Sequence, residues 1–315
     1  MNLFDQQKRN LTNTRLFIAG FVLLLAILGL GADGVLYGAG VTPGIPIATL
    51  GALCVGGFSA WWSLHGGDQA VLESAHAAPL DPSDPKERVL DNVVEEIAIA
   101  GGIPKPSVYV IPDSDLNAFA TGSGPEKASI AVTRGLLEKL DRAELQGVVA
   151  HELSHVRNYD VRLMTVVAAL AGAILLLSDW SRRGLWWGRR SRSDRGGGLG
   201  ILFVLLWMVS IVLAPIIAQI VSLAVSRQRE YLADASGSEL TRNPLGLASA
   251  LQKIDDAVDP TLSIKQGIAH LCIADPRGSA LDAREGFFSN LFSTHPPIAK
   301  RIALLREMAY QAGKA

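Results

Sequence analysis

The chain has few cysteines and no excess of charge of either sign. Only Cys54 and Cys272 occur among the 315 residues, and their wide separation predicts no disulfide framework and no local metal-binding or redox pair. The formal net charge of −1 argues against nucleic acid as a partner. Internal repeats and low-complexity arrays are also missing from the sequence. These absences exclude a disulfide-stapled scaffold, a repeat protein and a basic nucleic-acid-binding domain.

Apolar residues, by contrast, are abundant and occur in long runs. Hydrophobic residues make up 49% of the sequence and charged residues 19%, and the mean hydropathy is positive, which leaves room for one soluble domain plus membrane segments. The run at 45–64 has about the length that crosses a bilayer. We interpret the run at 16–32 as a membrane span and not a signal peptide, because no convincing small-residue cleavage site precedes the second run. Residues 1–67 therefore form an N-terminal membrane region with two predicted transmembrane helices.

The distribution of basic residues predicts the orientation of these spans. Lys8, Arg9 and Arg15 precede the first run, whereas residues 33–44 contain no Lys or Arg. By the positive-inside rule the N-terminus is then cytoplasmic, and the chain returns to the cytoplasm after the second span. A buried helix pair of a soluble protein is the alternative interpretation of the two runs.

Two further apolar runs, at 161–178 and 199–226, interrupt the second half of the chain. As a helix, the later run would reach about 42 Å, which exceeds the roughly 30 Å hydrocarbon core and allows the helix to continue beyond the membrane. The connection between the runs carries six arginines. Two membrane crossings would place these arginines outside, against the positive-inside rule, and no crossing would leave an apolar hairpin on the inner side. Both alternatives remain open at this point.

A His-Glu-x-x-His motif lies on a predicted helix. Asp141 and Glu144 have the spacing of a capping box, so a helix is expected to start near Asp141. On that helix His151 and His155 are four residues apart and project from one face, where both imidazoles can hold one tetrahedral metal ion. Glu152 is offset by one residue, too far round to be a ligand but near enough to take a proton from a metal-bound water. Without a third ligand, two surface histidines on an amphipathic helix remain the alternative.

The candidate third ligand is Glu230, on a helix predicted to follow the last apolar run. Glu230 and Asp234 are expected to lie one turn apart on the same face of this helix. One carboxylate can ligate the metal while Asp234 holds a ligand histidine through its free ring N–H. Alone, the pair would be interpreted as a solvated charge cluster with Arg227 and Arg229. Beside the His-Glu-x-x-His motif, we interpret Glu230 as the third metal ligand.

The sequence contains four separate motifs: His151-Glu152-Leu153-Ser154-His155, Arg229-Glu230-Tyr231-Leu232-Ala233-Asp234, Asn117-Ala118-Phe119-Ala120-Thr121-Gly122, and Thr294-His295-Pro296-Pro297 with Arg301-Ile302. These motifs resemble those of the M48 group of membrane-embedded zinc metallopeptidases, and within it the bacterial heat-shock proteases. They occur in the family's order and extend over residues 84–303, whereas the first 80 residues match only in general pattern.

The resemblance implies roles for residues that the patterns alone leave open. In the resembled family, residues 117–120 border the active-site cleft, where an exposed strand edge would bind an extended substrate backbone. From the residues alone, this segment would be a surface loop. His295 and Arg301 are implied to approach the cleft, where His295 would steady the oxyanion and Arg301 would bind the substrate peptide. Without the resemblance, His295 is only a histidine at the start of a helix.

The predicted fold class is α+β, a mostly helical gluzincin-like metallopeptidase domain with a small sheet, plus two to four transmembrane helices. The proline-rich residues 68–85 are interpreted as a linker. The metallopeptidase domain then occupies residues 86–315, interrupted by the apolar pair at 161–178 and 199–226. Outside the motifs, helices are predicted at 86–100, 135–140, 244–258 and 298–310, and strands at 107–111 and 129–133.

Together these patterns predict a zinc-dependent endopeptidase with one Zn²⁺ per chain and Glu152 as general base. By the resemblance, it lies in the cytoplasmic (inner) membrane of a bacterium as a multi-pass protein whose catalytic domain faces the cytoplasm. Its implied partners are the lipid bilayer and unfolded or damaged membrane-protein substrates, which it would cleave in stress-related quality control. A non-enzymatic membrane scaffold or holdase is one alternative. A prenyl-protein-type endopeptidase is the other, although a larger intramembrane chamber made of more spans would be expected there.

Overall fold

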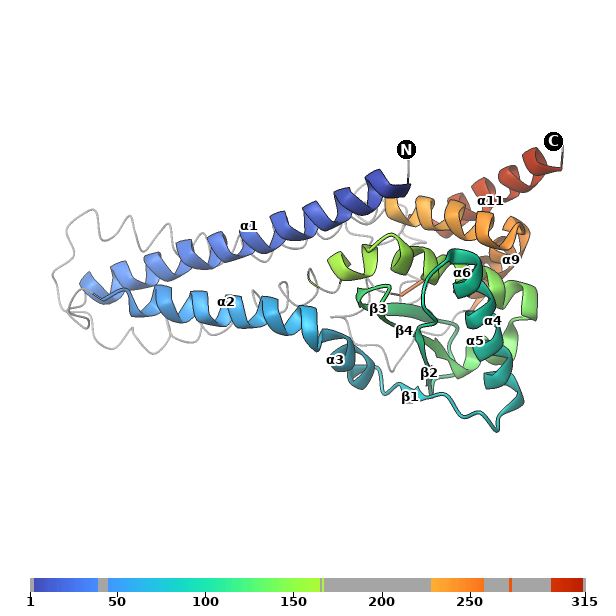
Figure 1. Cartoon of the computed structure of the whole chain (residues 1–315), viewed down its shortest axis with the longest axis horizontal. Coiled ribbons are helices and arrows are strands. Elements are labelled where there is room, and N and C mark those ends of the chain that lie inside the picture. The colour runs from blue at the N-terminus through green and yellow to red at the C-terminus, as the bar shows by residue number, and fades with distance from the viewer. Residues whose placement is uncertain are drawn as a thin grey trace. The chain divides into compact units, whose positions relative to one another are not determined.

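The structure of the chain is a computed structural model that describes residues 3–38, 45–164, 166, 228–257, 272–273 and 296–313. The chain divides into two compact units. The first comprises Met1–Leu11, Leu64–Thr165 and Ser222–Ala315, and the second Thr12–Ser63 and Val166–Val221. The first unit combines helices with a four-stranded sheet, whereas the described part of the second is helical (Figure 1). The described residues therefore have the predicted mixture of many helices and one small sheet.

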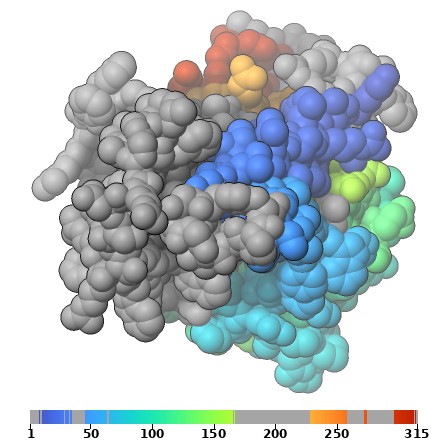
Figure 2. All heavy atoms as spheres, turned by 90° about the vertical axis from the view of Figure 1, so that its left-hand side faces the viewer, coloured from blue at the N-terminus to red at the C-terminus, as the bar shows by residue number. Residues whose placement is uncertain are grey.

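The two N-terminal apolar runs form a pair of helices, most of whose residues belong to the second unit. They are α1 (Leu3–Gly38) and α2 (Ile47–His65), which run antiparallel to one another (Figure 1). A Cβ atom on Gly29 would lie 2.5 Å from the Cα of Thr49, so the absence of a side chain there allows the two backbones to approach closely. The carboxylate of Asp33 accepts hydrogen bonds from the backbone N–H and the hydroxyl of Thr49, at 2.8 and 2.6 Å. The two helices are in direct contact in the space-filling view of Figure 2.

One helix in the described part of the chain is long and apolar enough to cross a membrane by itself, over Asn10–Gly31 of α1. The residues Ile47–Trp62 of α2 reach that length only together with Gly67–Ser74, across a bend of 77°. The first predicted span is therefore matched by a suitable helix, and the second by a broken one. The predicted runs at 161–178 and 199–226 lie almost wholly outside the described residues.

The sheet of the first unit has the strand order β1-β2-β4-β3. Its strands are β1 (Ala78–Pro79), β2 (Ser107–Ile111), β3 (Ala118–Gly124) and β4 (Lys127–Thr133). The strands β2 and β4 run parallel, β3 is antiparallel to β4, and β1 is antiparallel to β2. The strands predicted at 107–111 and 129–133 are confirmed. The segment that from its residues alone would be a surface loop is instead β3, at one edge of the sheet.

Glycine permits the irregular end of the β3–β4 hairpin. Gly122 has a φ of 137°, and a Cβ atom there would lie 2.1 Å from the carbonyl oxygen of Lys127. Gly124 has a φ of 148°, and the register of the two strands shifts between these glycines. Both conformations belong to the region that L-residues rarely adopt, so other residues would strain this bulge.

The helices predicted within residues 86–310 are also confirmed in the described part of the chain, with small shifts at their ends. They are α4 (Pro85–Gly101), α5 (Arg134–Lys139), α6 (Arg142–Arg157), α9 (Pro244–Asp256) and α11 (Ile298–Ala312). The stretch at 68–85, expected to be a linker, carries β1 and most of the short helix α3 (Gly67–Ser74). Val71 and Leu72 of α3 pack with Phe119 in a small core cluster of their own. This stretch therefore contributes to the compact first unit.

Helix α6 occupies the centre of the first unit. It starts at the predicted place, because Asp141 accepts a hydrogen bond from the N–H of Glu144 at 2.9 Å, and the Glu144 carboxylate accepts one from the N–H of Asp141 at 2.8 Å. Its residues 144–156 are buried except Gln146, in contact with α4, α9 and β3. A helix that is packed on several sides holds its side chains in narrowly defined positions. The His-Glu-x-x-His motif therefore sits on one of the best-supported elements of the fold.

Candidate metal centre

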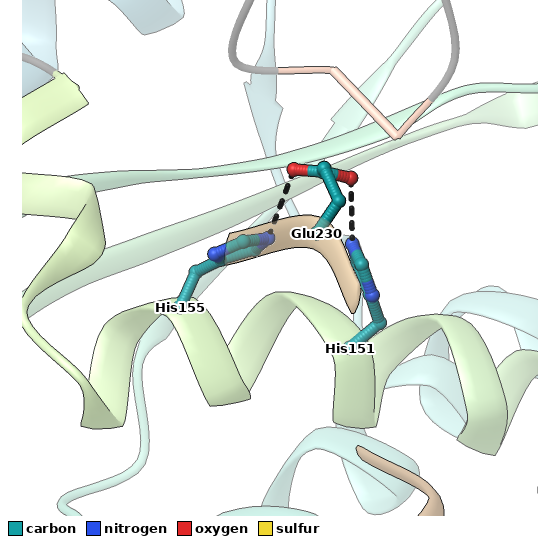
Figure 3. Close-up of side chains that lie close together, drawn as sticks. All are labelled: His151, His155 and Glu230. Carbon is teal, nitrogen blue, oxygen red and sulfur yellow. Dashed lines mark ion pairs between the residues drawn. The ribbon is translucent and has the colours of Figure 1, made fainter. Parts of the chain in front are cut away.

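The structure brings His151, His155 and Glu230 together as predicted. Both histidines project from α6, and Glu230 lies on the helix formed by residues 228–241 (Figure 3). All three side chains are buried, and one ligand atom from each lies within 4.8 Å of the others. The Nε2 atoms of His151 and His155 lie 3.6 and 3.5 Å from the two carboxylate oxygens of Glu230.

These separations fit a metal ion between the three side chains. They are too long for good hydrogen bonds, which have N···O distances of about 2.7–3.2 Å. Two atoms that each bind a tetrahedral ion at about 2.0–2.2 Å are roughly 3.4 Å apart. Two imidazoles and one carboxylate also form a common donor set for a catalytic metal, which keeps a further position open. The arrangement is therefore that of a three-ligand metal site.

Gly237 allows the helix that carries Glu230 to lie close to α6. A Cβ atom on Gly237 would lie 3.0 Å from the backbone nitrogen of His151 and 3.1 Å from the carbonyl carbon of Ala150. Such contacts are tighter than van der Waals packing normally allows, and the neighbouring atoms are backbone that cannot rotate away. Close approach of the two helices at this point helps Glu230 to reach the histidines.

Gly237→Val is therefore expected to weaken metal binding by about 10-fold or more, because the added methyl groups push Glu230 away from the histidines. Gly237→Ala should have a smaller effect of the same sign, although alanine favours helix more than glycine. The dissociation constant of zinc, measured by competition with a chromogenic chelator, tests this. Gly101→Ala is the matched control, because its new Cβ would meet no atom closer than 3.8 Å. Wild-type affinity in Gly237→Val would contradict the role of this contact.

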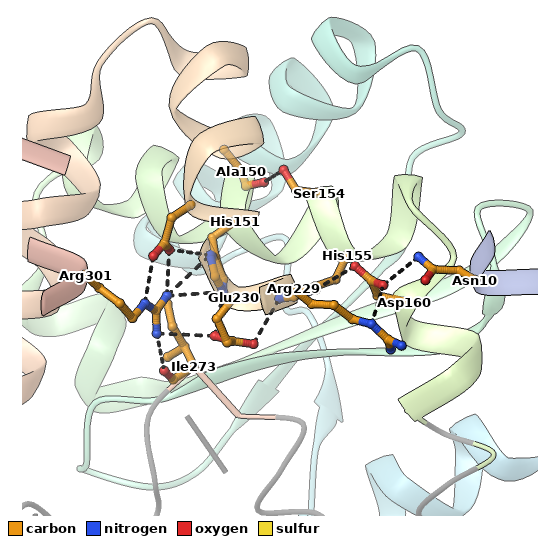
Figure 4. A network of polar contacts seen from close by, with 11 residues as sticks. Asn10, Ala150, His151, Ser154, His155, Asp160, Arg229, Glu230, Ile273 and Arg301 are labelled. Carbon is orange, nitrogen blue, oxygen red and sulfur yellow. Dashed lines mark hydrogen bonds and ion pairs between the residues drawn. The ribbon is translucent and has the colours of Figure 1, made fainter. Parts of the chain in front are cut away.

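Asp234 holds His151, as the sequence predicted for one of the histidines. Its Oδ1 lies 2.9 Å from Nδ1 of His151. The guanidinium of Arg301 in turn donates two hydrogen bonds to Asp234, from Nε to Oδ2 at 2.9 Å and from Nη2 to Oδ1 at 2.7 Å. It also donates from Nη1 to the carbonyl of Ile273 at 3.1 Å and lies 3.4 Å from Glu230 (Figure 4). The position of Asp234 is therefore fixed from α11.

Arg301 is fully buried, with 0% of its side chain exposed. Its predicted role in binding substrate stays a prediction, and its contacts favour a role in holding Asp234 against His151. A planar guanidinium that donates two parallel hydrogen bonds to a carboxylate gives such a pair a defined geometry.

A second carboxylate, Asp160, holds the other histidine and was not singled out from the sequence. Its Oδ2 lies 3.3 Å from Nδ1 of His155, and its Oδ1 lies 3.4 Å from Nε of Arg229. Asn10, near the start of α1, donates a hydrogen bond to Oδ1 of Asp160 at 2.7 Å (Figure 4). A carboxylate five residues beyond His155, just past the end of α6, is the sequence signal that could have identified Asp160. No local pattern pointed to Asn10.

These carboxylates also change the protonation of the histidines. Burial alone would lower the pKa of His155, but the adjacent carboxylates of Asp160 and Glu230 outweigh it and raise the pKa to about 10. Burial would lower the pKa of His151 too, but its contacts with the carboxylates of Asp234 and Glu230 exceed this effect and raise the pKa. Burial would raise the pKa of Asp234, but the neighbouring Arg301 guanidinium holds it at about 2. Metal binding therefore displaces protons from the histidines, and its affinity rises with pH.

Glu152 lies beside the candidate metal ligands, and its carboxylate contacts β3. Its side chain is buried, and the backbone N–H of Ala120 donates a hydrogen bond to its carboxylate. Burial raises the pKa of Glu152, against the opposing charges of His151 and His155. A carboxylate whose pKa is raised toward neutrality is suited to accept and return a proton.

The structure describes some of the remaining predicted site residues. Residues 117–120 are buried at the start of β3, and Ala120 among them contacts Glu152. The outer edge of this strand is paired in part, because Ile273 donates its N–H to the carbonyl of Ala118 at 2.9 Å. A substrate-binding role for Asn117, Ala118, Phe119 and Ala120 stays a prediction. His295 lies outside the described residues, and its role also stays a prediction.

Comparison with known proteins gives concordant results. The sequence model of Peptidase family M48 matches residues 84–309. A protein named "Protease HtpX homolog" from Caldanaerobacter subterraneus subsp. tengcongensis is 44% identical over 308 residues, which cover 97% of this chain and 98% of that protein. One of the same name from Limosilactobacillus reuteri is 43% identical over 312 residues, 97% of this chain and 100% of that protein.

A solved structure shares the fold at much lower sequence identity. The crystal structure of S. mikatae Ste24p superposes with a TM-score of 0.51 at 19% identity, and the match covers 96% of this chain and 66% of that one. At this level of identity the match concerns the fold alone.

Proposed function

The chain belongs to peptidase family M48, and from this premise we propose that it is a zinc-dependent endopeptidase that cleaves misfolded or damaged membrane proteins in the bacterial cytoplasmic membrane. Family membership, which the four motifs had indicated, makes it a metallopeptidase. The observation that carries the proposal is the buried set of His151, His155 and Glu230, whose ligand atoms lie within 4.8 Å of one another. Two imidazoles and a carboxylate suit zinc, and three protein ligands leave its fourth position for water.

The residues around this site would perform hydrolysis of a peptide bond. Bound zinc would lower the pKa of a water molecule and polarise the substrate carbonyl. Glu152 is placed to accept the proton of that water and to pass it to the leaving amine, and the N–H of Ala120 holds its carboxylate in position. Asp234 and Asp160 fix the two imidazoles through Nδ1 and leave Nε2 for the metal. His295 would steady the negative charge that develops on the carbonyl oxygen.

We further propose that the catalytic domain faces the cytoplasm and that the chain crosses the membrane more than once. The long apolar stretch of α1 supports the first span. The basic residues before it, and the absence of Lys and Arg from residues 33–44, support a cytoplasmic N-terminus. A cleft close to the inner membrane surface would meet cytoplasmic loops and frayed helix ends of damaged membrane proteins. The heat-shock proteases that the chain resembles have such a role in stress-related quality control.

A paired-substrate assay in detergent tests this proposal. A multi-span membrane protein and a destabilised variant of it are incubated with the purified chain, and cleavage is followed by gel electrophoresis. We expect the destabilised variant to be cut at least several-fold faster, because more of its backbone is exposed, and a chelator should stop both reactions. Bound but uncut substrate would point to a holdase. Cleavage restricted to a prenylated C-terminal peptide would point to the other alternative enzyme.

A further inference from the structure

The buried carboxylate of Asp160 determines how His155 is presented. Asp160 is 0% exposed, and its Oδ2 lies 3.3 Å from Nδ1 of His155, on the opposite side of the ring from Glu230. A carboxylate at Nδ1 fixes both the tautomer and the orientation of an imidazole, so that Nε2 points in one direction. His155 therefore depends on Asp160 as His151 depends on Asp234. Asp234 is itself held by Arg301, so the question is what holds Asp160.

Asn10 is the neutral group that holds Asp160. Its Nδ2 donates to Oδ1 of Asp160 at 2.7 Å and to the backbone carbonyl of Asn158 at 2.8 Å. Both hydrogens of the amide nitrogen are therefore used, one on the carboxylate and one on the chain just after α6. The side chain is buried, so these hydrogen bonds face little competition from water. Because a carboxamide carries no charge, Asn10 fixes Asp160 without neutralising it, unlike Arg229, whose Nε lies 3.4 Å from the same Oδ1.

Asn10 connects the surroundings of His155 to the first long apolar helix. Asn10 lies in the third turn of α1 and begins the stretch Asn10–Gly31 that is long and apolar enough to cross a membrane. Residues Met1–Leu11 nevertheless belong to the same compact unit as the metal ligands. We propose that Asn10 is a positioning residue for the metal ligand His155, acting through Asp160, so that the first turns of α1 form part of the metal centre.

This inference rests on the proposed zinc site and adds a function to the first membrane helix. If α1 served only to anchor the chain, a change at Asn10 would leave the site unaffected. If α1 holds Asp160, the same change loosens a metal ligand, and displacement of the start of α1 lowers the affinity for zinc. The structure thereby links the N-terminal helix to catalytic competence.

The test uses the full chain in detergent and compares Asn10→Ala with Asn13→Ala, the same substitution one turn further along α1. The dissociation constant of zinc is measured by competition with a chromogenic chelator. Asn10→Ala should bind zinc about 10-fold more weakly, at the lower end of the effects seen for groups that support metal ligands, and Asn13→Ala should match the wild type. With zinc in moderate excess, kcat of Asn10→Ala should fall while KM stays unchanged, because Asn10 does not touch substrate.

A double-mutant cycle tests whether Asn10 acts through Asp160. Asp160→Asn should weaken zinc binding more than Asn10→Ala does, and the double variant should be no weaker than Asp160→Asn alone, since Asn10 then has no carboxylate to hold. Independent, multiplying effects would overturn the proposal. So would zinc binding by Asn10→Ala within twofold of the wild type.

Two further comparisons keep the result interpretable. Asn10→Ser, which keeps one donor on a shorter side chain, should bind zinc with intermediate affinity, and wild-type affinity in this variant would overturn the proposal even if Asn10→Ala failed to fold. The wild type serves as the reference. If it bound no zinc, the proposed function itself would fail, whereas tight zinc binding by the wild type and Asn10→Ala alike would remove only the role of Asn10.

Discussion

Glu152→Gln is expected to lower kcat for peptide cleavage by about 10²–10⁴-fold while zinc stays bound. Glutamine has nearly the same volume as glutamate and still offers a carbonyl oxygen to the N–H of Ala120. It cannot accept a proton at neutral pH, so the proton of the attacking water has nowhere to go. Because Glu152 lies outside the set of three ligand atoms, the metal should remain.

Cleavage rates and zinc content are measured together on the same preparations. Glu138→Gln, an exposed glutamate at the end of α5, is the control for the loss of one carboxylate and should behave as the wild type. Undiminished cleavage by Glu152→Gln would remove Glu152 from the mechanism. Loss of zinc from this variant would instead give Glu152 a part in metal binding.

Glu230→Gln should lose zinc and, with it, cleavage. A neutral amide oxygen is a much weaker ligand than a carboxylate, and the site would hold only two imidazoles of comparable strength. The fall in zinc affinity should exceed the roughly 10–100-fold typical of groups that merely support a ligand. The buried guanidinium of Arg301, 3.4 Å from Glu230, would also lose a negative neighbour and further disfavour a cation at the site.

Elemental analysis after dialysis against a weak chelator measures this effect. Glu239→Gln is the matched control, because Glu239 lies on the same helix but is exposed to solvent. Its zinc content and cleavage rate should equal those of the wild type. Retention of one zinc per chain in Glu230→Gln would exclude Glu230 as a ligand.

The elements with strong local signals were predictable from the sequence. The capping box of Asp141 and Glu144 fixes the start of α6, and the spacing of His151 and His155 fixes their common face. Glu230 could be identified because the His-Glu-x-x-His motif requires a third ligand, whereas alone the Glu230 and Asp234 pair would be interpreted as a solvated charge cluster. One short segment therefore predicts the helix and its two histidines, and Glu230 follows only when the two segments are considered together.

The strand β3 could not be recognised from its residues. Its side chains, small except for Phe119, show no regular alternation of apolar and polar residues, because six of its seven positions are buried. Apolar and polar residues alternate regularly only in a strand that has one face buried and the other exposed. The short helix α3 was missed for a related reason, since the prolines and aspartates that follow it are typical of a linker and its burial depends on β3.

The supporting contacts of the metal site were the least predictable part. Arg301 and Asn10 reach the site from opposite ends of the chain, and both act through a carboxylate that they hold. A hydrogen bond between residues so far apart leaves no trace in local composition or periodicity. The cluster of His151, His155 and Glu230 and the contact of Asp234 with a histidine could therefore be predicted, whereas the contacts made by Asp160, Asn10 and Arg301 became visible only in the folded chain.

X-ray absorption at the zinc edge of the purified wild-type chain, with its zinc content, tests the central claim most directly. The account predicts one zinc per chain, bound by two imidazole nitrogens and by oxygen atoms at about 2.0–2.2 Å, with no sulfur ligand. Absence of zinc from carefully purified protein, or a zinc–sulfur distance of about 2.3 Å, would contradict it.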